Sequence, residues 1–273
     1  AKHIMGENEQ GGMLRTVVVL GIIAIISFVV IAAVVAIAKD STTSQTDTVT
    51  KIADAVDNVD DEATSNYEYI YDMSKSTASI YGVKDNKLIK GSTVTIPGRV
   101  KHNGTVFKIT SIGSSVFADS EVNGVTMSDN IVSIGSYAFK NDQLTSIRLS
   151  TNLKTIADGA FLSNQLGHVT IPASVTDIGK YAFQQNKLES VSISNGLKTI
   201  GDGAFNQNSL TKVTLPESVT QVGNFAFSQN KIEDGSVTIG KDTNYDSSYG
   251  NASFGLVWDS ASSSNVVLKP TIK

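Results

Sequence analysis

The sequence predicts a long hydrophobic N-terminal α-helix followed by a leucine-rich solenoid of 22-residue repeats, with a parallel β-sheet on one face. Three observations predict this fold class. A run of 23 residues near the N-terminus has no charged side chain. Phenylalanine recurs six times at a spacing of 22 residues, and a short alternation of aliphatic and polar residues recurs with the same period. A fixed period of roughly 20 to 50 residues indicates coils that stack on one another.

The uncharged run extends from Thr16 to Ala38, between Arg15 and Lys39. As a helix rising ~1.5 Å per residue it measures about 35 Å, which is enough to cross the hydrocarbon core of a bilayer. The run is longer than the apolar core of a cleaved secretory signal. We therefore expect a transmembrane or filament-core helix over 16–38, preceded by a polar segment over 1–15. A buried core helix is the alternative, but no other part of the chain is large enough to surround it.

Helical spacing of apolar residues continues after the hydrophobic run. The residues that follow this spacing are Val49, Ile52, Ala53, Val56 and Val59. Recurrence at three and four residues predicts an amphipathic helix to about Asp61. We expect an amphipathic helix and linker over 39–76, then the repeat domain with its terminal cap over 77–273.

The repeat is aligned most simply on its phenylalanines, which form the expected core. They are Phe117, Phe139, Phe161, Phe183, Phe205 and Phe227. Five residues before each one is Ile or Val, and Gly follows that residue in five of the six units, with Ala157 as the exception. Asn recurs three residues after Phe in the last four units. We expect the small residues to allow close approach of the backbone, and Asn to bond backbone groups inside a bend.

A second pattern follows each phenylalanine. Leu166-x-x-Val169-x-Ile171 is one of four such segments, and it has the LxxLxL spacing of a leucine-rich repeat. The alternation predicts a short strand with its aliphatic side facing inward. Near the C-terminus the pattern becomes irregular, and we expect a degenerate seventh turn around Phe254. Trp258 is expected to belong to the cap, with a ligand-binding role as the alternative.

The strands should form a continuous parallel sheet whose outward side chains are mostly small and hydroxylated. The candidate partner face consists of Thr126, Arg148, His168, Thr170, Ser192, Lys212 and Thr214. One interpretation is a solvated sheet surface in which Thr serves strand formation. The other is a flat surface that binds a host or neighbouring-cell protein or glycan, although the face lacks the aromatic anchors typical of interfaces.

The segment SVTDIGKYAFQQNKLESVSI resembles the BspA-like leucine-rich repeat family, and the lead-in STVTIPGRVKHNGTVFKITSIGSSVF resembles that family's first coil. The resemblance covers about residues 77 to 273. It implies a right-handed solenoid and a place among adhesive or host-facing proteins of the cell surface.

The segment MLRTVVVLGIIAIIS, residues 13 to 27, resembles the N-terminal helix of class-B type IV pilins such as the toxin-coregulated pilin. The resemblance implies a helix that anchors the subunit in the membrane and then forms a filament core with copies of itself. Twelve residues precede Met13, and Arg15 takes the place of the pilin glutamate. The candidate assembly charges are therefore Glu7, Glu9 and Arg15. Close helix packing is expected at Gly21, Ala24, Ala32, Ala33 and Ala36.

Composition argues against several other functions. The chain has no cysteine, three histidines and a net charge of −4. A disulfide framework, a thiolate metal site and a nucleic-acid-binding surface are therefore not expected. His102 and His168 lack an evident Ser and Asp partner in the sequence, and no phosphate-binding, zinc or calcium loop is visible. The acidic stretch over 57–62 is better interpreted as a solvated helix end than as a calcium site. We expect neither enzymatic activity nor a cofactor.

The sequence thus predicts a filament subunit that starts in the cytoplasmic membrane and displays its solenoid at the cell surface. A single-pass anchored adhesin that does not polymerise is the alternative, with the same topology across the membrane. A secreted enzyme accessory domain is a third interpretation.

Overall fold

The computed structural model describes residues 59–84, 88, 90–259 and 262–273. The chain divides into two compact units, Ala1–Asp57 and Asn58–Lys273. The described residues all belong to the second unit and form strands and turns, with no α-helix among them. Within this part of the chain, no helix is long and apolar enough to cross a membrane. The expected segments 1–15 and 16–38, with their assembly residues, lie outside the described residues.

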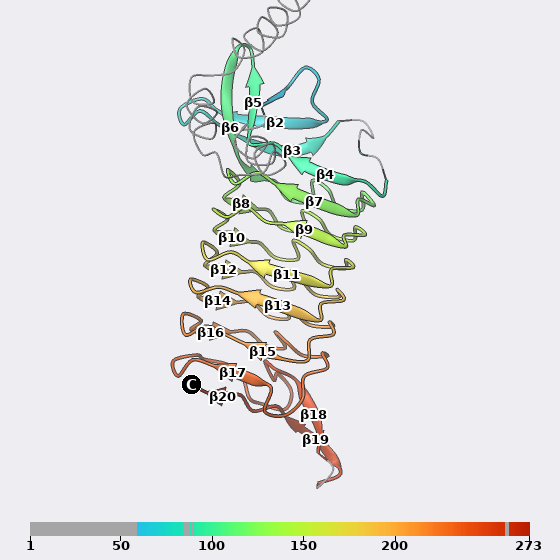
Figure 1. The fold of residues 1–273 in the computed structure, drawn as a ribbon, viewed down its shortest axis with the longest axis vertical. Helices are drawn as coiled ribbons and strands as arrows, with labels where there is room; N and C mark the ends of the chain where they lie inside the picture. Colours follow the sequence, from blue (N-terminus) through green and yellow to red (C-terminus); the bar gives the residue numbers. More distant parts are fainter. Residues whose placement is uncertain (1–58, 85–87, 89, 260–261) are drawn as a thin grey trace, which may run out of the picture. The chain divides into compact units, whose positions relative to one another are not determined.

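The second unit begins with an N-terminal cap of antiparallel and parallel strands (Figure 1). The cap strands are β1 (Val59–Asp61), β2 (Tyr67–Asp72), β3 (Thr77–Val83), β4 (Thr93–Ile96), β5 (Arg99–His102) and β6 (Thr105–Ile112). Strand β2 pairs antiparallel with β3, and β3 pairs parallel with β6. The cap therefore closes the first coil and continues into the solenoid.

This cap corrects the expectation of an amphipathic helix and linker over 39–76. The described residues of that range include β1 and β2, so the predicted helix does not extend to Asp61. Tyr67 and Tyr69 alternate with exposed or half-buried neighbours and are both buried. A strand that buries alternate aromatic side chains is favoured in this region, and the weak helical spacing before it does not predict the structure. Strands β2 and β3 pair with each other on the two sides of the expected boundary at residue 77.

Each coil contributes to two parallel strand ladders (Figure 1). The first ladder contains β7 (Gly124–Met127), β9 (Ser146–Arg148), β11 (His168–Ile171), β13 (Ser190–Ile193), β15 (Val213–Thr214), β17 (Val237–Ile239) and β20 (Thr271–Ile272). The second contains β8 (Ser133–Ile134), β10 (Thr155–Ile156), β12 (Asp177–Ile178), β14 (Thr199–Ile200) and β16 (Gln221–Val222).

The expectation of one continuous sheet is wrong in detail. Together with β4 of the cap, the first ladder divides into three sheets, β4-β7-β9, β11-β13 and β15-β17-β20. The second ladder, which the sequence patterns did not predict, is unbroken from β6 through β16. Its strands are only two residues long, which is too short for an alternation of polar and apolar residues to be recognised.

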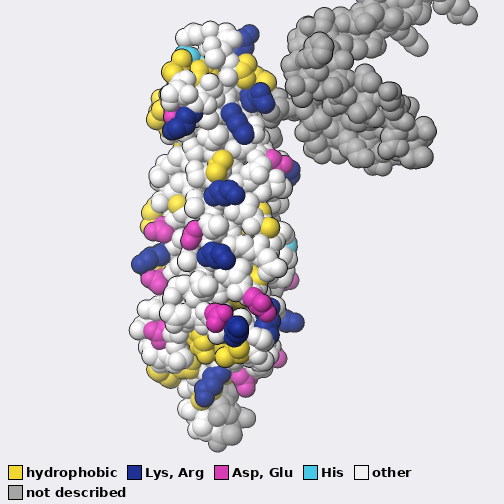
Figure 2. Space-filling view, turned by 90° about the vertical axis from the view of Figure 1, so that its left-hand side faces the viewer, with side chains coloured by type: hydrophobic (Ala, Val, Ile, Leu, Met, Phe, Trp, Pro, Cys, Tyr) yellow, Lys and Arg dark blue, Asp and Glu magenta, His cyan; other side chains and the backbone are white. Residues whose placement is uncertain are grey.

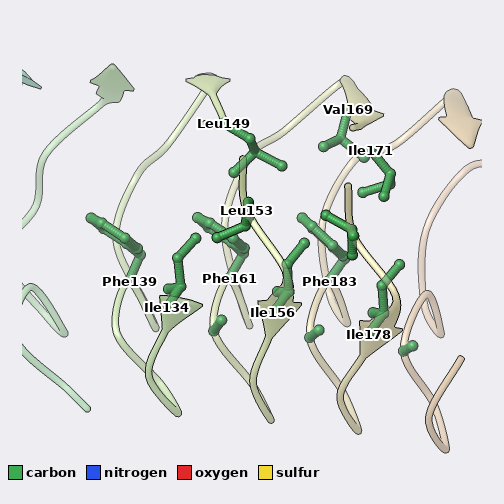
Figure 3. Packing of buried hydrophobic residues seen from close by; sticks show 14 of the residues in the cluster. Ile134, Phe139, Leu149, Leu153, Ile156, Phe161, Val169, Ile171, Ile178 and Phe183 are labelled. Atoms are coloured by element: carbon green, nitrogen blue, oxygen red, sulfur yellow. The ribbon is translucent and has the colours of Figure 1, made fainter. Parts of the chain in front are cut away.

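The predicted repeat core is confirmed. All six phenylalanines are fully buried, and their rings stack from coil to coil. Figure 3 shows Phe139, Phe161 and Phe183 in successive coils. Ring centroids of successive pairs lie 4.9 to 5.4 Å apart, with interplanar angles of at most 10°. Phe254 continues the stack on Phe227 at 5.6 Å, which confirms the seventh turn. No single coil encloses these rings, so stability depends on stacking.

Polar contacts also join the coils. The side-chain amide of Asn164 donates to the carbonyl oxygens of Phe139 at 2.7 Å and Phe161 at 3.2 Å. Its oxygen accepts a hydrogen bond from the Leu144 amide at 3.0 Å. The same three bonds recur at Asn186, Asn208 and Asn230. We call these four residues the asparagine column. The predicted role of Asn in bonding the bend is confirmed.

The solenoid ends in an antiparallel hairpin of β18 (Leu256–Asp259) and β19 (Ser264–Val267). Val257 packs against the core cluster that includes the buried Leu268. Trp258 lies in β18, within the segment that was expected to form the cap. Phe254 and Leu268 thus continue the hydrophobic core into the last turn.

Candidate functional site on the strand face

The strand face is defined here as the outward side chains of the first ladder: Thr126, Arg148, His168, Thr170, Ser192, Lys212 and Thr214. Parallel register places Thr126 beside Arg148 and Thr170 beside Ser192, and it places Thr214 beside Thr238. Thr126 is half-buried, whereas the other six are exposed. The predicted residues therefore lie at equivalent or adjacent positions of successive coils, although the strands that carry them belong to three separate sheets.

His168 lies near the middle of this face and contacts two hydroxyl groups. Its Nδ1 lies 2.8 Å from Ser190 Oγ, and its Nε2 lies 3.1 Å from Thr170 Oγ1. Neither of these two partners of the ring is a carboxylate. A serine activated for nucleophilic attack needs a base that a third group orients. His168 has hydroxyls on both sides instead, so it is better suited to hydrogen bonding than to catalysis.

Arg148 is held against the neighbouring coil. Its guanidinium donates to the Met127 carbonyl oxygen at 2.5 Å and lies 3.2 Å from Asp129 Oδ2. Partial burial favours the neutral form of Asp129, but hydrogen bonds from Thr151 and the Arg148 charge outweigh it and lower the pKa of Asp129. The guanidinium is therefore partly neutralised, and this end of the face has little free positive charge.

The strand face consists mostly of small hydroxyl side chains and carries two cations, Arg148, which is paired with Asp129, and Lys212. Where the strands pair, as in β11 and β13, hydroxyl groups recur at ~4.8 Å, the distance between paired strands. An exposed row of hydroxyl groups can form many weak hydrogen bonds with an extended partner. Figure 2 shows a different side, the left-hand side of Figure 1 next to the second ladder, where charged side chains are scattered among uncharged ones.

The N-terminal cap holds a polar cluster that the sequence patterns missed. Glu62 contacts Nδ1 of His102, and the Tyr71 ring stacks on the imidazole at 4.4 Å. Asp60 accepts a hydrogen bond from Tyr69 Oη at 2.6 Å and one from Ser65. Burial and the Asp60 charge raise the pKa of Tyr67 to about 12. No sequence spacing connects Glu62 to His102, because β5 brings them together from 40 residues apart.

This cluster lies beside a cavity of about 450 Å³ that Asp60, Thr64, Tyr67 and Leu88 help to line. The contacts of Glu62, His102 and Asp60 tie β1 to β2 and β5, which gives the cluster a structural role in the cap. Among the described residues, no group of three or more His, Cys, Asp or Glu side chains could hold a metal ion. The acidic stretch over 57–62 forms β1 in its described part, not a helix end.

Stacked coils, two parallel ladders and an asparagine column define a leucine-rich-repeat solenoid. Residues 110–233 match the family described as "BspA type Leucine rich repeat region" in six copies. The chain therefore carries a BspA-type leucine-rich-repeat domain, as its sequence resemblance implied. No curated protein matches the chain significantly.

Two crystal structures show the same fold. The pneumococcal vaccine antigen PcpA has a TM-score of 0.56 at 23% identity, over 66% of this chain and 49% of its own. A leucine-rich cell surface protein from Faecalibacterium prausnitzii has a TM-score of 0.50 at 24% identity, over 75% of this chain and 59% of its own. The chain thus spans about half of the first protein and three fifths of the second.

Proposed function

We propose that this chain is a cell-surface interaction protein whose solenoid binds a host or neighbouring-cell protein or glycan through the strand face. The observation that carries the proposal is the exposed row of hydroxyl and amine-bearing side chains across consecutive coils. A rigid row of this kind fits an extended partner better than a small substrate. The proposed action is binding, without catalysis or a cofactor. The surface placement is supported by the repeat type and by the F. prausnitzii structure, which is described as a cell surface protein.

Charge substitutions on the strand face test this proposal. Beads coated with the full chain are expected to adhere to cultured epithelial cells or to cells of the producing strain. Thr170→Glu combined with Ser192→Glu should abolish adhesion, because it places two carboxylates side by side in the row. The control is Thr155→Glu combined with Gln221→Glu, which changes exposed residues of the second ladder. Equal adhesion of both double variants and the unchanged chain would contradict the proposal.

We further propose that the N-terminal segment holds the protein in a type IV pilus-like filament. Support comes from the uncharged run over 16–38, its pilin-like sequence and its small residues. Before assembly, the same run would anchor the subunit in the cytoplasmic membrane. Electron microscopy of producing cells tests this, because deletion of the gene should remove a class of surface filaments. Unchanged filaments would overturn the filament role.

A membrane-anchored adhesin that does not polymerise is the second candidate, favoured by the presence of Arg15 where pilins have glutamate. Extraction in mild detergent separates the two functions. A filament subunit should sediment as a polymer from sheared cells, whereas an anchored adhesin should remain in the membrane fraction as a monomer. Mass spectrometry of the mature N-terminus, including its methylation, provides the independent readout.

A further inference from the structure

Aromatic residues occupy one position of the turn before the phenylalanine stack in every second coil. They are Tyr137, Tyr181 and Phe225, each two residues before a stacked phenylalanine and 44 residues from the next. We call these three residues the ring row. Each is about two fifths exposed. The same 44-residue spacing separates Pro172 from Pro216, so the solenoid alternates between two types of coil.

Glycine takes the same position in the two intervening coils. A Cβ atom on Gly203 would lie 2.7 Å from Cδ1 of Tyr181, and a Cβ on Gly159 would collide with the Tyr137 ring. Both glycines are buried. Each tyrosine ring therefore lies across the backbone of the following coil, which fixes its position. The Lys140 ammonium lies 5.7 Å from the centroid of the Tyr137 ring.

The backbone at this position favours glycine. Tyr137 and Tyr181 have φ of 58°, and Phe225 has φ of 57°. Bulky residues rarely adopt this left-handed conformation, which costs them roughly 1–2 kcal/mol each. The glycines of the alternate coils adopt similar φ values without that cost. Exposed aromatic side chains that are retained against local preference are typical of functional positions.

The spacing of the ring row indicates the partner. Paired strands lie ~4.8 Å apart, so rings in alternate coils are about 10 Å apart along a straight line. In an extended β-1,4-linked polysaccharide, successive sugars are rotated by half a turn, and the same sugar face recurs once per disaccharide. The disaccharide has nearly the same length as two coils. We propose that the ring row binds a linear, uncharged β-1,4-linked polysaccharide by stacking aromatic rings on alternate sugars.

The polar side chains next to the ring row suit an uncharged, hydroxyl-rich partner. Gln185 Nε2 donates to Gln207 Oε1 at 3.0 Å, and Ser163 Oγ donates to Gln185 Oε1 at 2.8 Å. These side chains, of which Gln185 is exposed and the other two are half-buried, connect amide and hydroxyl groups across coils, four residues after the ring-row position. On the other side, the Lys180 ammonium is paired with Asp202 at 3.0 Å. Neutral hydrogen-bonding groups and the Lys180–Asp202 pair complement a neutral glycan better than a charged one.

The proposal goes beyond the strand face and does not depend on filament assembly. It is tested by calorimetric titration of the full chain in mild detergent with cellohexaose and chitohexaose. A hexasaccharide reaches all three rings, so its affinity should exceed that of cellobiose or chitobiose by at least tenfold. Maltohexaose, an α-linked and helically curved chain, should not bind.

Substitutions in the ring row complete the test. Tyr181→Gly should lower hexasaccharide affinity by at least tenfold, and Tyr181→Phe should retain it because stacking uses the ring. Glycine is chosen because it suits the left-handed backbone, and a melting temperature close to that of the unchanged chain verifies folding. Tyr81→Gly, which removes an exposed aromatic residue outside the row, is the matched control.

Failure of either hexasaccharide to bind would overturn the proposal, as would equal binding of maltohexaose. Unchanged affinity in Tyr181→Gly would also overturn it, by showing that the ring serves only to cover Gly203. The Thr170→Glu and Ser192→Glu double variant should bind hexasaccharides normally. Adhesion of this double variant therefore tests the strand-face proposal, while its hexasaccharide binding tests the ring-row proposal, so the two can fail separately.

Discussion

The side-chain nitrogen of Asn186 donates a hydrogen bond to the carbonyl oxygen of Phe161 in the preceding coil, at 2.9 Å. It also donates to the carbonyl oxygen of Phe183 in its own coil at 3.2 Å, while the Asn186 oxygen accepts from the Leu166 amide. One buried amide thus satisfies three backbone groups that have no access to water. The asparagine column therefore fixes the spacing of the coils around the phenylalanine stack.

Replacement of Asn186 should accordingly be costly. Asn186→Ala leaves three buried backbone groups without these partners, and we expect a loss of about 3 kcal/mol in the free energy of unfolding. Urea denaturation followed by circular dichroism measures this loss. Gln165→Ala, on an exposed neighbouring position, is the control and should change stability little. A loss below about 0.5 kcal/mol for Asn186→Ala would show that water or relaxation replaces the bonds.

Asp142 occupies the column position of the second coil and gives the fold a pH dependence. Its Oδ1 accepts from the Ser120 amide at 2.8 Å, but its buried Oδ2 has no hydrogen-bond partner. Burial raises the pKa of Asp142 to about 7, and the nearby Asp119 charge adds to the effect. The folded state therefore binds a proton more tightly than the unfolded chain. This contribution to stability is complete below about pH 4 and is lost as the pH rises to about 7.

Asp142→Asn should remove this dependence. The variant should match the unchanged protein near pH 4 and exceed it by about 2 kcal/mol in free energy of unfolding at pH 8. Thermal and urea denaturation between pH 4 and 8 measure the difference. Asn164→Asp is the reciprocal variant and should become less stable as the pH rises. Parallel pH profiles for Asp142→Asn and the unchanged protein would contradict the assignment.

The phenylalanine stack should be intolerant of truncation. Phe183 is fully buried between rings at 5.2 and 5.4 Å, so Phe183→Ala opens a cavity inside two interfaces at once. We expect a loss of about 3–5 kcal/mol. Phe254 lies in the terminal coil and stacks on one phenylalanine, Phe227. Phe254→Ala should therefore lower the free energy of unfolding by less than Phe183→Ala does. Calorimetric melting of both variants gives the comparison, and a larger loss at Phe254 would contradict stacking as the source of stability.

Close approach of the coils explains the glycine that precedes each turn. A Cβ atom on Gly201 would lie 2.6 Å from the Lys180 backbone nitrogen. In the one coil with alanine, the Ala157 amide lies 3.2 Å from the Ile134 carbonyl oxygen, compared with 2.8 Å for Gly201 and Ile178. Gly201→Ala should therefore destabilise the fold by about 1–3 kcal/mol, as overpacking does. Ala157→Gly should be nearly neutral; equal melting shifts in the two variants would argue against close packing as the cause.

The solenoid could be predicted from the sequence because its core residues repeat with one fixed period. The six phenylalanines and the asparagine column have the same period, so a departure from the pattern at one position does not change the predicted coil. The N-terminal cap could not be predicted in this way. Its strands occur once, and the contact of Glu62 with His102 depends on tertiary pairing that no local pattern records.

The candidate surfaces were predicted unevenly. The strand face followed from the alternation within each strand, and parallel pairing placed Thr170 beside Ser192 as expected. The second ladder was missed because two-residue strands carry no alternation. The ring row was visible as a 44-residue spacing of Tyr137, Tyr181 and Phe225, but its exposure depends on the left-handed turn. A search for periods at twice the repeat length would have found it.

Display of the solenoid at the cell surface is the central claim, and immunogold electron microscopy of intact producing cells tests it most directly. Antibodies raised against residues 110–233 should label unpermeabilised cells, with gold particles along filaments that extend from the envelope. A strain that lacks the gene gives the background. Labelling that appears only after the cells are permeabilised would contradict the account.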